Sequence, residues 1–293
     1  MIRVGPAGWS YPDWDGPVYP RPKPRGFHPL AFLSRFVNTI EINSSFYGLP
    51  KRENSVHWAE LIAHLPKFRF IAKLHQDFTH STRPLAELAR EVGEFHFGFE
   101  PLIQAGRLSA LLAQFPLGFR FEPGAATRLS ELCSVFARVP LVVELRHASW
   151  FEPPGMGLIE ELGCSLAAID LPKAANHPPA DHPTPGPIGY LRLHGRNAAA
   201  WFARDSGRDE KYDYLYTTAE IATLAERARR LAGGHDETFV VTNNHFEGKA
   251  VANALELLAS LTGARVPAPR SLALRYPQLQ AMTKSEGQAE LFS

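Results

Sequence analysis

The feature that most constrains the fold is a repeated alternation of short apolar runs with amphipathic segments. Eight apolar runs have the length and composition of buried strands, and each ends where polar residues begin. These predicted strands lie at residues 2–5, 39–43, 68–74, 111–115, 141–145, 164–169, 188–193 and 238–242. Helical spacing of apolar residues predicts helices over 30–36, 56–65, 85–92, 126–137, 158–162, 217–231 and 251–261. Strands that alternate with helices pair in parallel through right-handed crossovers, so the sequence predicts an α/β fold.

The number of these units favours one closed barrel. A (β/α)8 barrel takes about 250 residues, and this chain has 293. We therefore predict a single TIM-type barrel over residues 1–281, with an open doubly wound sheet as the alternative, because no sequence pattern proves closure. Six prolines between Pro172 and Pro187 predict that the sixth helix is reduced or missing, because proline lacks a backbone donor and clashes inside helices.

Composition narrows the classes of function. The formal net charge is +1, so no overall field draws the chain to nucleic acid or membrane, and such binding would need a local basic patch. The two cysteines are far apart in the sequence and do not indicate a disulfide framework. No apolar run reaches membrane-spanning length, and the first ten residues lack the pattern of a signal peptide. We therefore expect a cytoplasmic protein.

The polar residues at the ends of the strands define the predicted site. In a parallel barrel the loops after the strands converge on one mouth, where active sites lie. Residues expected to bind a substrate there are Trp9, Tyr11, Asn43, Tyr47, Lys73, His75, Arg146, His147, Arg192, Arg196, Asn243 and Asn244. Residues expected to be catalytic are His194, His245, Glu144 and Asp170.

The basic residues indicate an anionic ligand. Arg146, Arg192, Arg196 and Asn243 would hold the anion, because barrels bind phosphate beside the loops after strands seven and eight. The N-terminus of the last helix, near Lys249, favours an anion as well. In the alternative interpretation, Lys249 is a solvated surface residue and the asparagines cap the helix. A second alternative joins Glu41, Lys73, Glu144 and Arg192 in an internal salt-bridge network.

Histidines supply the candidate proton-transfer groups, since their side chain titrates near neutral pH. His194 or His245 would take this role, with Glu144 or Asp170 as the carboxylate partner. A metal is not favoured: Glu144, Asp170 and His194 are suitable ligand types, but they lack a tight spacing, and two arginines nearby disfavour a divalent cation. No P-loop, dinucleotide fingerprint or serine elbow is present, so no cofactor is expected.

Two further features lie around the predicted mouth. Residues 195–216 form a long connection after the seventh strand and are a candidate lid. Aromatic residues also gather at the strand ends, where they can stack on bases or sugars or pack against the barrel rim.

Several motifs resemble those of the YecE-like family, also called domain of unknown function 72. They are GWSYPDW (8–14), EINSSFYGLP (41–50), KLHQDFTH (73–80), VELRHASWF (143–151), YLRLHGRN (190–197), YDYLYT (212–217) and TNNHFEGKAVANAL (242–255). The resemblance extends to about Pro277 and implies a TIM-type barrel without implying a reaction. The family's shape is similar to that of the barrels of xylose isomerases and endonuclease IV, whose evident metal-ligand set this chain lacks.

The C-terminal residues 282–293 are polar and predict a short disordered tail. Within it, Gln288, Leu291 and Phe292 resemble the anchors of the pentapeptide by which bacterial DNA-processing proteins bind the replicative sliding clamp. Ala289 departs from this motif, which usually has leucine there. A plain tail without a partner is the alternative.

These features predict a protein that binds a phosphate-bearing substrate, such as DNA or a nucleotide, at the barrel mouth. The reaction would be metal-independent hydrolysis of a phosphoester, or isomerisation. One alternative is a non-catalytic module that binds nucleic acid or protein and is recruited to the sliding clamp. Another alternative is an enzyme that acts on small sugars or sugar acids.

Overall fold

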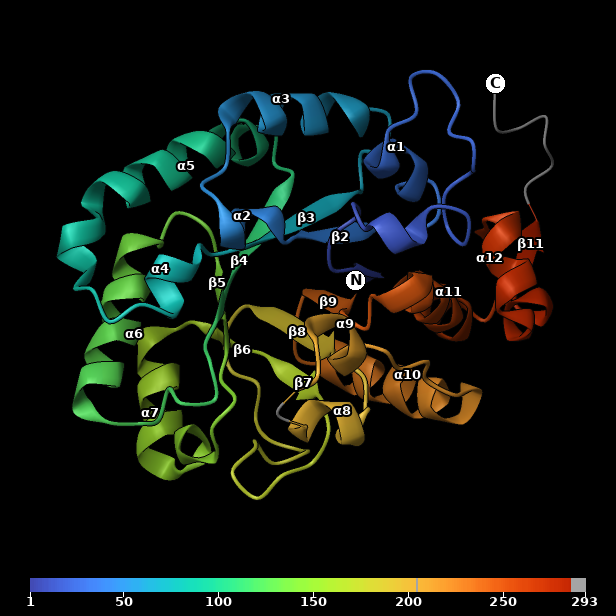
Figure 1. Ribbon diagram of the computed structural model, residues 1–293. Coiled ribbons are helices and arrows are strands. Elements are labelled where there is room, and N and C mark those ends of the chain that lie inside the picture. Colours follow the sequence, from blue (N-terminus) through green and yellow to red (C-terminus); the bar gives the residue numbers. More distant parts are fainter. Residues whose placement is uncertain (204, 286–293) are drawn as a thin grey trace.

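The computed structural model describes residues 1–203 and 205–285 (Figure 1). Strands occur at all eight predicted positions, and the sixth is interrupted at Ala167. The strands are β1 (Ile2–Pro6), β2 (Thr39–Ile42), β3 (Arg69–Lys73), β4 (Leu108–Gln114), β5 (Leu141–Glu144), β6 (Ser165–Leu166), β7 (Ala168–Asp170), β8 (Ile188–Leu193), β9 (Glu237–Thr242), β10 (Val266–Ala268) and β11 (Thr283–Ser285). All pairings between these strands are parallel, which confirms the predicted α/β class.

The main strands form two parallel sheets. One has the order β2-β3-β4-β5-β6 and the other the order β1-β9-β8-β7. At one junction, a single bridge pairs Ala7 with Glu41, and the Gly8 N–H donates to the Glu41 carbonyl over 2.8 Å. At the other junction only Ala167 separates β6 from β7, and its N–H donates to the Val143 carbonyl of β5 over 2.9 Å. The hydrogen-bond ladder is thus in two pieces, whereas the sequence predicted one continuous barrel.

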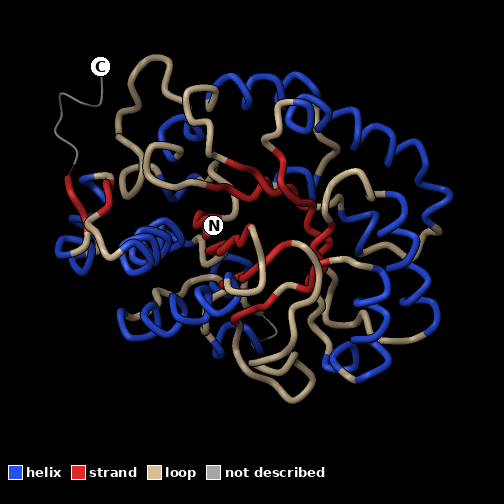
Figure 2. The backbone as a smooth tube through the Cα atoms, turned by 180° about the vertical axis from the view of Figure 1, so that it is seen from behind, coloured by secondary structure: helices blue, strands red, loops and turns tan. Residues whose placement is uncertain are grey.

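Helices surround the strands in an outer layer, as Figure 2 shows. The α-helices are α1 (Pro29–Leu33), α2 (Ser44–Tyr47), α3 (Arg52–Leu61), α4 (Gln76–Thr79), α5 (Ala89–Gln104), α6 (Pro123–Val135), α7 (Pro153–Leu162), α8 (Ala198–Phe202), α9 (Arg208–Lys211), α10 (Thr218–Ala232), α11 (Lys249–Thr262) and α12 (Arg270–Arg275). Short 3-10 helices span Pro12–Trp14, Leu85–Leu88, Ala148–Phe151, Phe246–Gly248 and Pro277–Ala281.

Local sequence signals place several helix ends. Thr217 caps α10: its hydroxyl accepts from the Glu220 N–H, and the Glu220 carboxylate accepts from the Thr217 N–H, as the spacing predicted. Helix α7 ends at Gly163, which has a positive φ of 64°. Residues 171–187 contain turns and no helix, in agreement with the proline-rich sequence there.

The strands contribute to two apolar clusters, one on each face. Residues of the inner cluster alternate along the strands with residues of the outer one: on β9, Phe239 and Val241 belong to the inner cluster and Val240 to the outer. Both sheets supply the inner cluster, for example Leu112 from β4 and Tyr190 from β8. The two sheets therefore share one apolar cluster.

The C-terminal part of the described chain adds a separate two-stranded sheet. Strand β11 pairs with β10, with Thr283 in register with Val266. Thr283–Ser285 is therefore ordered in a strand, so the predicted disordered tail cannot begin at residue 282. The proposed clamp-binding residues Gln288, Leu291 and Phe292 lie outside the described residues.

Candidate functional site

A cavity of about 570 Å³ opens at the carboxyl ends of the strands. Its wall includes the last residues of β3 and β4, Lys73 and Gln114, and residues that directly follow β2 and β9, Asn43 and Asn243. This is the mouth that parallel strand ends were expected to form. The volume lies within the range of about 300–1,000 Å³ that is usual for sites of small ligands.

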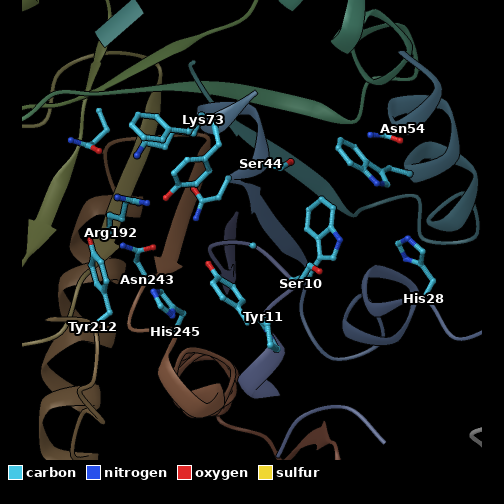
Figure 3. Close-up of a pocket in the computed structure, with 18 of the residues that line it drawn as sticks. Ser10, Tyr11, His28, Ser44, Asn54, Lys73, Arg192, Tyr212, Asn243 and His245 are labelled. Atoms are coloured by element: carbon cyan, nitrogen blue, oxygen red, sulfur yellow. The ribbon is translucent and has the colours of Figure 1, made fainter. Parts of the chain in front are cut away.

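Eight of the predicted site residues line this cavity. They are Trp9, Tyr11, Asn43, Tyr47, Lys73, Arg192, Asn243 and His245. Figure 3 shows Arg192, Asn243, His245 and Tyr212 on one side, His28 and Asn54 on the opposite side, and Tyr11 and Ser10 between them.

Arg192 is the centre of a buried ion-pair cluster beneath the cavity. Its side chain is fully buried, and its guanidinium donates two bonds to Glu41, of 2.9 and 2.7 Å, and one to Glu144 of 3.0 Å. Tyr190 also donates its hydroxyl hydrogen to Glu41. Because β2 and β5 belong to one sheet and β8 to the other, Arg192 joins the two sheets through side chains. Burial opposes its charge, but Glu41 and Glu144 hold the pKa of Arg192 well above its usual value.

Glu144 extends this cluster to two further predicted residues. Its Oε1 accepts from Arg146 over 2.8 Å and lies 3.2 Å from Nε2 of His194. Burial raises the pKa of Glu144, but the charges of Arg146 and Arg192, together with His194, outweigh it and hold that pKa well below the usual value. Glu144 is therefore an ionised carboxylate at neutral pH.

His194 is completely buried and is neutral near pH 7. Burial, with the nearby arginines, lowers its pKa to about 4, although Glu144 acts in the opposite direction. Its Nδ1 lies 3.1 Å from the Asn243 side-chain nitrogen, which donates to it. This contact fits the tautomer that carries the proton on Nε2, toward Glu144. Asn243 thus links the buried cluster to the cavity, which His194 itself does not line.

Glu41, Glu144, Arg146 and Arg192 each form an ion pair within this cluster. Lys73 differs from them, because no carboxylate of the described residues pairs with it. The side chain is 9% exposed, and its ammonium nitrogen lies 3.7 Å from the centre of the Phe46 ring. Burial, and then the charge of Arg192, lower the pKa of Lys73 to about 7. The predicted internal network therefore exists for Glu41, Glu144 and Arg192, whereas Lys73 contributes to the cavity wall.

Asp170 and Arg196 lie outside this cavity and bind each other. Arg196 donates to both oxygens of Asp170, over 2.9 and 2.7 Å, and Tyr216 donates to the same carboxylate over 2.7 Å. A third bond joins Arg196 to Glu220 over 2.9 Å. These contacts engage both predicted groups in a separate cluster around the start of α10. The sequence suggested Asp170 as the carboxylate partner of His194 or His245. In the structure its carboxylate instead binds Arg196 and Tyr216.

Four other predicted residues have structural contacts. His75 and His147 accept from backbone N–H groups of Asp77 and Ser149 at the starts of short helices. The Asn244 amide donates to Asn253 and to the Tyr214 carbonyl, and the residue is fully buried. Arg146 bonds to Glu144 and does not line the cavity.

The N-terminus of α11 is occupied by groups of the chain itself. Asp13 accepts from the Glu247 N–H over 2.5 Å, and Lys249 forms an ion pair with Asp213. An internal carboxylate, Asp13, therefore takes one of the N–H groups that were expected to bind an anion just before this helix. Lys249 is partly buried and paired, so it is not the solvated residue of the alternative interpretation either.

The wall opposite Arg192 was missed by the sequence interpretation. It contains His28, which precedes α1, and Asn54, His57 and Trp58 of α3. Three of these residues have spacings of three and four, so they share one helix face. That spacing is present in the sequence. The residues around α3, however, do not indicate that the start of this helix reaches the cavity. Ser10, Ser44, Phe46, Gln114 and Tyr212 also line the cavity.

The predicted lid segment contacts the site through aromatic rings. Tyr212, which follows α9, lines the cavity, and its ring centre lies 5.2 Å from that of His245. Trp201 of α8 lies 6.0 Å from the His194 ring, measured between ring centres. On the other side, the His245 ring is stacked on Tyr11 at 4.6 Å. His245 is therefore held between rings from two loops.

Within residues 1–203 and 205–285, no group of three or more His, Cys, Asp or Glu side chains is arranged to hold a metal ion. The described helices include none that is both long and apolar enough to cross a membrane.

Comparison with known proteins identifies sequence relatives across nearly the whole chain. The family described as "Protein of unknown function DUF72" matches residues 3–274. The protein YunF of Bacillus subtilis (strain 168) is 27% identical over 274 residues, which cover 89% of this chain and 95% of YunF. YecE of Escherichia coli (strain K12) is 30% identical over 153 residues, which cover 52% of this chain and 50% of YecE.

Solved structures show the same fold. A DUF72 family protein from Thermotoga maritima MSB8 superposes with a TM-score of 0.75 at 30% identity, covering 89% of this chain and 99% of that one. A D-tagatose 3-epimerase-like protein has a TM-score of 0.50 at 13% identity, with 79% and 92% covered. SacUVDE has the same TM-score at 10% identity, with 80% and 85% covered. The last two likenesses concern the fold alone.

Proposed function

The chain belongs to the DUF72 family, and we propose that it binds a small phosphate-bearing or otherwise anionic organic molecule in the mouth cavity and acts on it there. The size of the cavity favours a single nucleotide or sugar phosphate over a nucleic-acid duplex. The aromatic walls and the amides of Asn43 and Asn243 suit the ring and the polar groups of such a ligand.

The fold that carries this site would be one closed barrel of eight strands, with β6 and β7 as one strand. The inner apolar cluster shared by both sheets, the Ala7–Glu41 bridge and the bonds of Arg192 across the sheets support this proposal. Closure places the ends of all strands on one rim, so that ligand contacts from β1 to β9 converge.

The observation that carries the proposed function is the unpaired charge of Lys73. Around it, the carboxylates of Glu41 and Glu144 balance the guanidinium groups of Arg146 and Arg192. When Lys73 is protonated, the wall of the cavity therefore holds one positive charge for which the described residues supply no counterion. A buried cation is costly unless it is paired, and a bound anion would supply the partner.

This assignment changes the roles expected from the sequence. Arg146, Arg192 and Arg196 were expected to hold the anion, but each is already bonded to carboxylates of the chain. Lys73 takes that role in the proposal. Of the two candidate histidines, His245 lines the cavity and is the proposed proton-transfer group. His194 does not line the cavity and accepts a hydrogen bond from the Asn243 amide.

The test is the binding of sulfate, which stays doubly charged over the pH range used, to the wild type, Lys73→Met and Lys73→Arg. Only protonated Lys73 pairs with the anion, so wild-type affinity should be highest below pH 7 and should fall as the pH rises through the Lys73 pKa of about 7. Loss of the charge in Lys73→Met should weaken binding about 10- to 100-fold. Calorimetry at pH 6 and pH 8.5 measures both effects.

Groups other than Lys73 can also change the pH dependence of sulfate binding, so the experiment needs a baseline variant. The charged groups that act on Lys73 are Glu41, Glu144, Arg146 and Arg192. His80 also faces Lys73, and burial lowers its pKa to about 4, so it stays neutral throughout. Lys73→Arg keeps a permanent charge, and its pH profile therefore gives the baseline set by the other residues of the cavity wall. Lys249→Met serves as the matched control, since Lys249 pairs with Asp213 and does not line the cavity. Equal affinity in the wild type and in Lys73→Met would refute the proposal.

A further inference from the structure

We propose that the Lys73 amine condenses with the carbonyl group of a small anionic oxo compound, a 2-oxo acid or a phosphorylated aldehyde or ketone, to form an imine. This inference rests on the proposed anion-binding function of the same cavity and names the reactive group of its ligand. It assigns a covalent step to the site, whereas the proposed function requires only binding.

The placement of the amine is the geometric basis. Lys73 is the last residue of β3, where the strand reaches the cavity, and Figure 3 shows it on the upper wall beside Ser44. Its side chain is more than nine-tenths buried, yet no carboxylate of the described residues pairs with it. Other lysines, such as Lys249 with Asp213 and Lys23 with Asp15, have carboxylate partners. A lysine in such a pair keeps its proton and cannot attack a carbonyl.

The protonation state of Lys73 suits a nucleophile. Burial and the charge of Arg192 lower its pKa to about 7, so near neutral pH a large share of the amine is unprotonated. An exposed lysine, with a pKa of about 10.4, would be almost wholly protonated there.

The reaction balances without an oxidant or a second substrate. The nitrogen lone pair of Lys73 forms a bond to the carbonyl carbon, and the carbonyl oxygen takes a proton to give a carbinolamine. This oxygen takes a second proton and leaves as water, while the nitrogen lone pair completes the C=N bond. Both hydrogens of the water come from the amine. His245 and the amide of Gln114 line the same cavity and can relay the protons and bind the carbonyl oxygen, respectively.

The cavity also suits the product. The neutral imine nitrogen takes up one proton from solvent, and the iminium then carries its positive charge at the position of the Lys73 ammonium, whose nitrogen lies 3.7 Å from the centre of the Phe46 ring. The ring face stabilises a cation there. The anionic group of the oxo compound then pairs with this charge, so one ligand supplies both the electrophile and the counterion.

The test is reductive trapping. The protein is incubated with pyruvate, glyceraldehyde 3-phosphate or acetone, and sodium borohydride is added to reduce any imine to a stable secondary amine. We expect a single adduct with pyruvate or with glyceraldehyde 3-phosphate, located at Lys73 by peptide mass spectrometry, and much less with acetone, which lacks an anion. The two anionic probes distinguish a carboxylate from a phosphate ligand.

Two variants separate this inference from the proposed function. Lys73→Arg keeps the charge, so it should bind sulfate but form no adduct. Lys249→Arg, the matched control, should form the adduct as the wild type does. An adduct of equal yield in Lys73→Arg, or none in a wild type that binds sulfate through Lys73, would overturn the imine proposal while leaving anion binding intact. Thermal unfolding of each variant verifies that it is folded.

Discussion

At the scale of single residues, burial gives two basic side chains of the same cavity different roles. The planar guanidinium of Arg192 makes three hydrogen bonds to two carboxylates, and this fork is suited to a buried ionic cluster. The ammonium of Lys73 meets no carboxylate within the described part of the chain, and burial lowers its pKa to about 7. The presence of a basic residue in the sequence therefore does not indicate that it binds a ligand. Whether it can do so depends on the carboxylates that surround it in the folded protein.

His194 provides a prediction about stability at the residue scale. Its pKa is about 4 in the folded protein and about 6.5 in an unfolded chain, so below pH 6.5 the unfolded state binds a proton that the folded state does not. The contribution to stability is complete above pH 6.5 and is lost as the pH falls toward 4, by about 3 kcal/mol.

Urea unfolding of the wild type and His194→Gln at pH 7 and pH 4 measures this effect. The wild type should lose more free energy of unfolding between the two pH values than the variant does. His147→Gln is the control, because its ring is only partly buried at the start of a short helix. A difference between the wild type and His194→Gln that does not change with pH would contradict the argument.

At the scale of elements, the approach of β1 to β2 depends on the absence of a side chain. A Cβ atom on Gly5 would lie 1.7 Å from the Thr39 carbonyl oxygen, so only glycine permits this distance between the strands. The approach brings Ala7 into its bridge with Glu41, and β1 then leads Trp9 and Tyr11 into the cavity. Strand packing at one glycine thus positions two wall residues.

We predict that Gly5→Ala destabilises the protein by about 1–3 kcal/mol, as overpacking of a core does, and also weakens sulfate binding. Gly93→Ala in α5 is the control, since a Cβ there meets nothing within 4 Å. That control should be neutral or slightly stabilising, because alanine favours helices. Chemical denaturation compares the two, and equal stabilities would show that β1 and β2 separate at no cost.

At the scale of the whole molecule, we assign the cavity and the last residues of the chain separate tasks. The cavity lies among strands and loops, whereas Gln288, Leu291 and Phe292 lie beyond the described residues. We propose that these three residues bind the replicative sliding clamp, as the resemblance of their spacing to the clamp-binding pentapeptide suggests.

Deleting residues 288–293 should abolish capture of the protein by immobilised clamp and leave sulfate affinity unchanged. A milder variant, with Leu291→Ala and Phe292→Ala, should have the same effect on capture. Substitution of Lys284, which lies before the motif, should have no effect. Undiminished capture after the deletion would refute the role of the tail.

The fold was more predictable than the site. Strand positions, the capping box of Thr217 and the helix-free stretch after β7 follow from local patterns, and the structure contains each of them. The cavity wall from α3 and the separate cluster of Asp170 with Arg196 do not follow from such patterns. Residues of the right type at strand ends were necessary for the site but did not specify which of them face one another.

The sequence alone determined the order and type of the elements, because the periods of strands and helices and their caps depend on neighbours a few residues apart. Tertiary structure alone decided the charge pairing, since Arg192 meets Glu41 across 151 residues and Glu144 across 48. Which strand ends face each other depends on sheet register and on how the sheets meet, and neither is encoded locally. Lys73 meets no carboxylate in residues 1–203 and 205–285, and this observation, on which the proposed function rests, is a consequence of that long-range geometry.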